Sequence, residues 1–164
     1  MKTPLRLLLL LITTVFLGGC MGGPKKLDYT PSPARFYLES NGESFSTATL
    51  PISGVRVAIG SKAYIGEADI IRVEQVKADL GTVFIFYLTA AAGRDLYRFT
   101  GNSQGRRLVL AINDRVIGVR MIDRPFSESM IATYVEVPEA EQAELLKNLN
   151  RTCEELQKEL ARKG

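Results

Sequence analysis

The chain has 164 residues, of which 46% are hydrophobic, a size and composition that suit one domain with a packed core. Its 21 basic and 18 acidic residues nearly balance, and Lys2 and Arg6 lie in the N-terminal segment, so we expect no nucleic-acid partner. The absence of histidine excludes Ser-His and Cys-His nucleophiles and the commonest zinc sites, and no calcium or phosphate loop has the usual spacing, so we expect no metal and no cofactor.

The chain begins with basic residues, continues with an apolar run from Leu7 to Leu17 and ends this segment in small residues before Cys20. This order is typical of a secretory signal peptide, and the apolar run is short for a membrane-spanning helix. The ending Leu17-Gly18-Gly19-Cys20 resembles the lipobox of bacterial lipoproteins. The resemblance implies that residues 1–19 are removed and that acyl chains on Cys20 anchor the protein in membrane lipid. The alternative is an ordinary secretory peptide with a chance cysteine.

Residues 20–34 are predicted to be the lipidated Cys20 and a flexible tether, because they carry no hydrophobic pattern and contain several Gly and Pro residues. The folded domain is predicted over residues 35–164. Since Met21 rather than Asp follows Cys20, the periplasmic face of the outer membrane is the expected location in a Gram-negative cell.

Alternating apolar residues predict a series of strands in the body of the chain. The predicted strands are 34–40, 54–59, 70–76, 83–88, 107–112, 115–122 and 130–137. Tight turns are expected at Asp79-Leu80-Gly81 and at Asn113-Asp114, because Asn, Asp and Gly tolerate the positive φ that hairpin turns require.

Two helices are predicted. The first begins after the N-cap Thr89 and runs from Ala90 to about Asn102. The second covers residues 138–163, and its apolar stripe consists of Leu146, Leu149, Cys153, Leu156 and Leu160. Because Cys153 lies on this stripe, we expect it to be a buried thiol and not a reactive one.

Two predicted strands, 83–88 and 107–112, are apolar on both faces. The two helices cover one face of the expected sheet, and the other face is either covered by residues 35–66 or is a binding surface. The predicted fold is therefore α+β, with a mixed, mainly antiparallel sheet and two helices packed on one face.

An ordered series of short motifs occupies residues 88–126. Leu88-Thr89 starts a helix that closes on Thr100, Gly105-Arg106-Arg107-Leu108 opens a strand, and Ile122-Asp123-Arg124-Pro125 follows a hairpin. With its flanks, over residues 54–150, the series resembles the periplasmic head region of SecD and SecDF, accessory subunits of the bacterial preprotein translocase. The departures from that pattern are Asn113-Asp114 for an Asp-Gly turn, Arg120 for a Pro, and Ser127-Glu128-Ser129 for a Gly-rich stretch.

The resemblance implies a SecD-head-like α+β fold that contacts protein chains, without the membrane helices that make SecD an export motor. We therefore predict a lipid-anchored envelope protein with a binding or scaffold domain, no catalysis of its own, and an envelope protein or an exported polypeptide as its partner. Arg106 and Arg107 are the candidate contacts for an anion or for that partner. Two alternatives stay open: a small envelope hydrolase using carboxylates, and a structural protein that assembles through its C-terminal helix.

Overall fold

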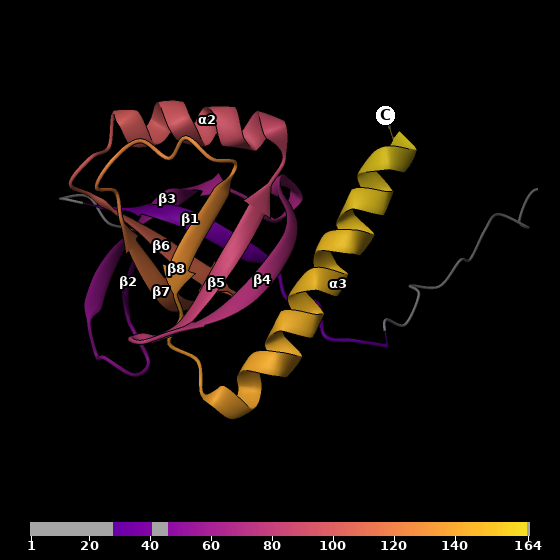
Figure 1. Cartoon of the computed structure of the whole chain (residues 1–164), viewed down its shortest axis with the longest axis horizontal. Helices are drawn as coiled ribbons and strands as arrows, with labels where there is room; N and C mark the ends of the chain where they lie inside the picture. The colour runs from indigo at the N-terminus through magenta and orange to yellow at the C-terminus, as the bar shows by residue number, and fades with distance from the viewer. Residues whose placement is uncertain (1–27, 41–45, 164) are drawn as a thin grey trace, which may run out of the picture.

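The computed structural model describes residues 28–40 and 46–163 (Figure 1). Its strands are β1 (Ala34–Glu39), β2 (Ser46–Thr49), β3 (Arg56–Ile65), β4 (Ile70–Ala78), β5 (Gly81–Leu88), β6 (Arg107–Ile112), β7 (Arg115–Met121) and β8 (Met130–Tyr134). Its helices are the 3-10 turn η1 (Glu67–Asp69), α2 (Ala90–Gly101) and α3 (Glu139–Lys163). The predicted signal peptide and Cys20 lie outside the described residues.

The strands form two antiparallel sheets and not the single sheet expected from the sequence. One sheet has the order β2-β3-β1-β6-β7, and the other has the order β4-β5-β8. Both sheets contribute side chains to one core, in which Phe36 of β1 meets Phe86 of β5 edge to face with ring centroids 5.0 Å apart. The α+β class with mainly antiparallel strands is confirmed, and the second sheet takes the place expected for a layer of helices.

The strand β6 is buried on both faces, as its sequence requires. Leu108 and Leu110 belong to the main core, whereas Val109 on the opposite face packs in a second cluster with Leu50 and Val57. The prediction that residues 35–66 cover the second face is thus confirmed for this strand. The hairpin that follows β6 is also as predicted, because Asn113 and Asp114 have φ values of 51° and 60°.

Helix α2 lies across one end of the sheets (Figure 1). The hydroxyl oxygen of Thr89 accepts a hydrogen bond from the backbone N–H of Ala92 at 3.2 Å, which confirms the predicted N-cap. Leu96 of α2 is buried on the side of the helix that faces the core, and Phe99 stacks on Tyr64 of β3 with ring centroids 3.9 Å apart. These contacts place α2 over the end of the core and not on a sheet face.

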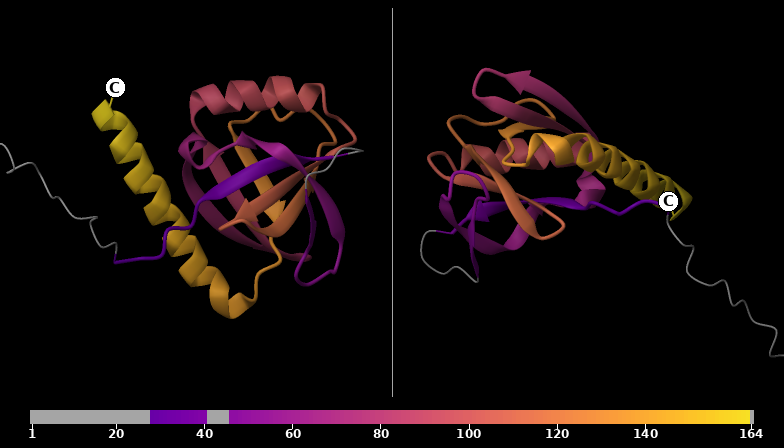
Figure 2. Two further views of the ribbon diagram at one scale, coloured as in Figure 1. Left: turned by 180° about the vertical axis from the view of Figure 1, so that it is seen from behind. Right: turned by 90° about the horizontal axis from the view of Figure 1, so that it is seen from below.

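Helix α3 lies beside β4, at the edge of the three-stranded sheet (Figure 2). The expectation that both helices pack on one sheet face is therefore wrong in its arrangement. The physical reason is that polar side chains of α3 hydrogen-bond the free backbone edge of β4, as Asn150 does with Val73. The apolar stripe is buried at Leu149 and Cys153, but Leu160 is 47% exposed.

The described part of the predicted tether is packed against the domain. Ser32 is 3% exposed, and its backbone N–H donates to Thr152 Oγ1 at 2.8 Å. The buried Ala34 already belongs to β1, which begins one residue before the predicted boundary at residue 35. The hydrogen bond to Thr152 of α3 explains why this segment is packed against the domain. The linear sequence does not place that side chain near residue 32.

Candidate functional site

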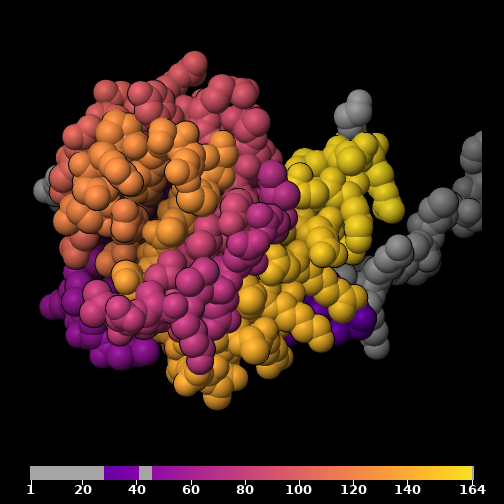
Figure 3. Space-filling view, viewed as in Figure 1, coloured from indigo at the N-terminus to yellow at the C-terminus, as the bar shows by residue number. Residues whose placement is uncertain are grey.

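The three-stranded sheet turns one face to the core and the other to solvent. The residues of the solvent side, here called the outer face, are paired across β4, β5 and β8 as Arg72–Tyr87–Met130, Glu74–Ile85–Ala132 and Val76–Val83–Tyr134. Figure 3 shows these strands from the front. The opposite side of β5 is fully buried at Phe84 and Phe86, whereas Val76 and Tyr134 of the outer face are 45% and 43% exposed. Strand β5 therefore differs from β6: its second apolar face is left open within the described chain.

One corner of the outer face is polar and internally paired. The guanidinium of Arg72 lies over the Tyr87 ring, 3.6 Å from its centroid, and forms an ion pair with Glu74. The Tyr87 hydroxyl donates to Glu74 Oε2 at 2.7 Å. Because these groups satisfy one another, the part of the outer face that is free to bind is the apolar part around Ile85.

Two hollows flank the outer face, one at each end of β8. The hollow at the N-terminal end has a volume of about 210 Å³ and is lined by Arg120, Arg124, Phe126 and Met130, among others. The hollow at the C-terminal end has a volume of about 520 Å³ and is bordered by Tyr134 and by Leu80, which is 86% exposed. Both hollows are continuous with β8, and their linings mix apolar side chains with charged ones such as Arg120 and Glu136.

Two acidic residues line the C-terminal hollow. Glu136 Oε2 accepts hydrogen bonds from the backbone N–H groups of Ile52 and Ser53, each at 2.8 Å. Burial acts to raise the pKa of Glu136, but the hydrogen bonds from Ser53 and Ile52 outweigh it and lower the pKa. The pKa of Glu139 is also lowered, by its hydrogen bond from Lys77. Each of the two carboxylates thus has a partner within the domain, the backbone of residues 52 and 53 for Glu136 and Lys77 for Glu139.

The sequence-predicted contact residues Arg106 and Arg107 lie at the start of the five-stranded sheet's β6. Arg107 forms a two-point ion pair with Glu39, in which Nε donates to Oε2 at 2.6 Å. Arg106 Nη2 donates to the backbone oxygen of Glu39 at 2.5 Å. Both side chains thus hold the end of β1 against β6, and neither belongs to the outer face. Their contact with an external partner stays a prediction.

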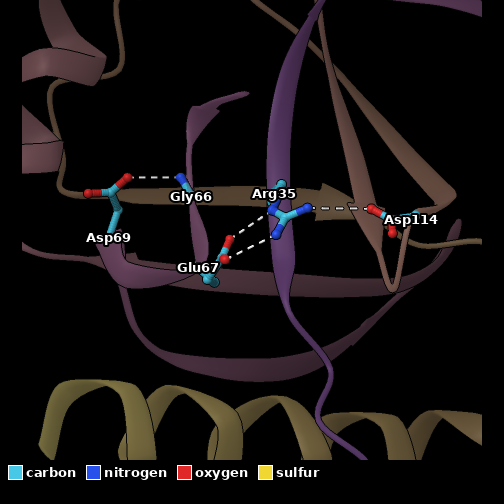
Figure 4. Close-up of polar contacts among 5 residues, drawn as sticks. All are labelled: Arg35, Gly66, Glu67, Asp69 and Asp114. Carbon is cyan, nitrogen blue, oxygen red and sulfur yellow. Dashed lines mark hydrogen bonds and ion pairs between the residues drawn. The ribbon is translucent and has the colours of Figure 1, made fainter. Parts of the chain in front are cut away.

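Another ionic cluster joins β1, η1 and the β6–β7 turn (Figure 4). Arg35 donates to both carboxylate oxygens of Glu67, at 2.8 and 3.0 Å, and lies 3.4 Å from Asp114 Oδ1. The hydrogen bond from Arg35 lowers the pKa of Glu67. Since every group in the cluster has an internal partner, its role is to fix η1 to the five-stranded sheet.

The chemistry available elsewhere in the described chain is limited. Within residues 28–40 and 46–163, no group of three His, Cys, Asp or Glu side chains is placed to hold a metal ion. Burial raises the pKa of the Cys153 thiol to about 11, so it is not a thiolate at neutral pH. No helix in the described part of the chain is long and apolar enough to cross a bilayer.

Comparison with known proteins supports the fold. No family model and no curated protein matches the chain. A solved structure of SecDF, described as a membrane component that enhances protein export, matches 73% of this chain with a TM-score of 0.57 and 13% identity, over 62% of its own length. A crystal structure of SecDF in its super-membrane-facing form matches 73% with a TM-score of 0.58 and 15% identity, over 18% of its length.

The chain therefore spans less than two thirds of either SecDF structure. At these identities the likeness shows the fold alone: the chain has an α+β fold similar to that of SecDF. The sequence resemblance to the SecD head is confirmed at that level. The outer face was missed as a set of residues, although the two apolar faces of residues 83–88 were a signal for it.

Proposed function

We propose that the chain is a lipid-anchored binding module of the bacterial envelope, which contacts a polypeptide at its outer face and catalyses no reaction of its own. The observation that carries the proposal is the open apolar surface of β5 and β8, on which Tyr134 is 43% exposed. Exposed apolar patches next to polar residues are typical of interaction surfaces.

The composition of the outer face suits a polypeptide partner. Tyr134 and Met130 are side chains of the types enriched at protein interfaces, and Met adapts to different partners. The two hollows offer space for side chains at either end of β8. SecDF has the same kind of fold and is described as enhancing protein export, which also supports a polypeptide as the occupant.

The anchor is supported by the lipobox-like ending at Cys20, which precedes the folded domain by a short segment. Its test is fractionation of cells that express the wild type or Cys20→Ser. The proposal expects the wild type in the membrane fraction and the variant in the soluble envelope fraction. A Cys20→Ser protein that stays with the membrane and is still cleaved would contradict the anchor.

The binding surface is tested by placing a photoreactive cross-linker at Ile85 or at Tyr97 in the membrane-bound protein. Tyr97 is a matched control, because it is a large, 52% exposed side chain on α2 and not on the outer face. The proposal expects cross-links to a fluorescent, permanently unfolded polypeptide from position 85 and not from position 97. Equal yields from the two positions would count against the outer face.

A further inference from the structure

The N-terminal segment Asp28–Pro33 is fixed along α3 before the chain enters β1. Ser32 donates its backbone N–H to Thr152 Oγ1 at 2.8 Å, and both residues are buried, at 3% and 7% exposure. On the other side of the segment, the oxygen of Pro33 accepts from the backbone N–H of Asn113 at 3.1 Å. The segment is thus held between α3 and the β6–β7 turn.

A second set of contacts holds the start of the same segment. Arg151 of α3 forms an ion pair with Asp28, and its guanidinium stands 4.5 Å from the centroid of the Tyr29 ring. Together with the buried hydrogen bond of Ser32, these contacts fix where the chain reaches the domain. That point is beside the middle of α3, on the side of the molecule opposite β2 (Figures 1 and 2).

The position of this point limits the distance from an anchor at Cys20. Only residues 21–27 separate Cys20 from Asp28. A fully extended chain covers about 3.5 Å per residue, so these steps span at most about 28 Å. A domain of this size has a diameter of about 36 Å. A tether of at most about 28 Å therefore cannot reach the membrane when the opposite side of the domain faces it. A tether that ran free to residue 34 would reach about 49 Å and would allow any orientation.

We infer that the contact of Asp28–Pro33 with α3 orients the domain, so that the α3 side rests against the lipid headgroup surface and the outer face stays open to the side. The inference rests on the proposed function only in requiring a lipid on Cys20. Exposed side chains of α3 include Lys147 and Lys158 but also Glu144 and Glu154, so the tether and not net charge fixes this contact. The orientation is therefore independent of anionic lipid.

The test uses the acylated full-length mature protein, with Cys153→Ala, on phosphatidylcholine vesicles that contain a lipid with a nitroxide on its headgroup. A fluorophore is attached at Glu155→Cys on α3 or at Thr47→Cys on β2, both exposed positions. We expect strong quenching at position 155 and weak quenching at position 47, with the same ratio when phosphatidylglycerol is added.

Two variants are designed so that the domain is no longer held in this orientation. Thr152→Val with Arg151→Gln removes the partners of Ser32 and Asp28. An insertion of six residues, (Gly-Ser)3, after Leu27 lengthens the tether to about 49 Å without touching the fold. Both are expected to bring the two quenching values together. Equal quenching in the vesicle-bound parent protein would overturn the inference and leave the anchor intact. An acylated protein that does not bind vesicles would overturn the anchor and the inference together.

Discussion

Asn150 of α3 pairs with the backbone of Val73 in β4 as a neighbouring strand would. Its Oδ1 accepts from the Val73 N–H at 2.8 Å, and its Nδ2 donates to the Val73 oxygen at 2.9 Å. Two helical turns further along α3, Gln157 Nε2 donates to the backbone oxygens of Ala68 and Ile70 at 3.0 and 3.3 Å. The helix thereby covers an edge that would otherwise pair with another chain, and this leaves the outer face as the open surface of the sheet.

Replacing Asn150 by Leu is expected to lower the free energy of unfolding by about 2 kcal/mol, because a donor and an acceptor of Val73 lose their partners. Leu favours the helix more than Asn, so helix propensity does not explain the loss. Urea unfolding followed by circular dichroism measures it. The control is Asn148→Ala, in the same helix, which should stay near the wild type. An Asn150→Leu protein as stable as the wild type would refute the edge pairing.

Gly118 of β7 is expected to tolerate no side chain. An added Cβ would lie 2.5 Å from the backbone oxygen of Tyr134, at the point where the two sheets meet. Because a backbone atom cannot move aside as a side chain can, Gly118→Ala should lower the free energy of unfolding by about 2 kcal/mol or more. Gly101→Ala is the control, since its Cβ would meet Pro125 at an ordinary 3.9 Å. Equal thermal midpoints for the two variants would show that the sheets are not in contact there.

The Arg35–Glu67 pair predicts a contribution to stability that depends on pH. The pKa of Glu67 is lowered from 4.5 in the folded protein, so the contribution is present above that value and is lost as the pH falls through the folded pKa. Because both side chains are about one third exposed, the loss should be about 0.5–1 kcal/mol. Glu67→Gln should lack this acid-dependent loss, whereas Glu144→Gln should keep it. Urea midpoints at neutral and acid pH measure the difference, and parallel curves for wild type and Glu67→Gln would contradict it.

The thiol of Cys153 is expected to be unreactive until the protein unfolds. It is 5% exposed, and burial raises its pKa to about 11. In a Cys20→Ser background, labelling by a thiol reagent at neutral pH should be slow and should speed up at the urea concentration that unfolds the domain. Rapid labelling of the folded protein would place the thiol at the surface.

Local features of the fold could be predicted from the sequence, because each depends on neighbouring residues. The cap at Thr89, the turn at Asn113-Asp114 and most strand positions follow from side-chain chemistry within a few residues. The end of the last strand did not. The last strand was predicted to continue to Val137. In the structure, the N–H of Val135 donates to the oxygen of Thr82 in one sheet, whereas the N–H of Glu136 donates to the oxygen of Ile117 in the other. The chain crosses between sheets there, which no local pattern encodes.

The arrangement of the elements depends on contacts between distant residues. The division into two sheets follows from the pairing of β1 with β6 and with β3. The position of α3 follows from Asn150 and Gln157, which lie beside its apolar stripe. The sequence did raise the question of the second face of residues 83–88. Only the register of β5 with β8, which sets Ile85 beside Ala132, gathers those side chains into one surface.

Binding of a polypeptide to the outer face can be measured by a titration. The mature domain with Cys20→Ser is titrated with a fluorescent, carboxymethylated and permanently unfolded polypeptide, and the dissociation constant is compared with those of Ile85→Lys and Tyr97→Lys. Binding is expected to be about tenfold weaker for Ile85→Lys, or about 1.4 kcal/mol, and unchanged for Tyr97→Lys. No binding by the parent domain, or equal affinity for parent and Ile85→Lys, would contradict it.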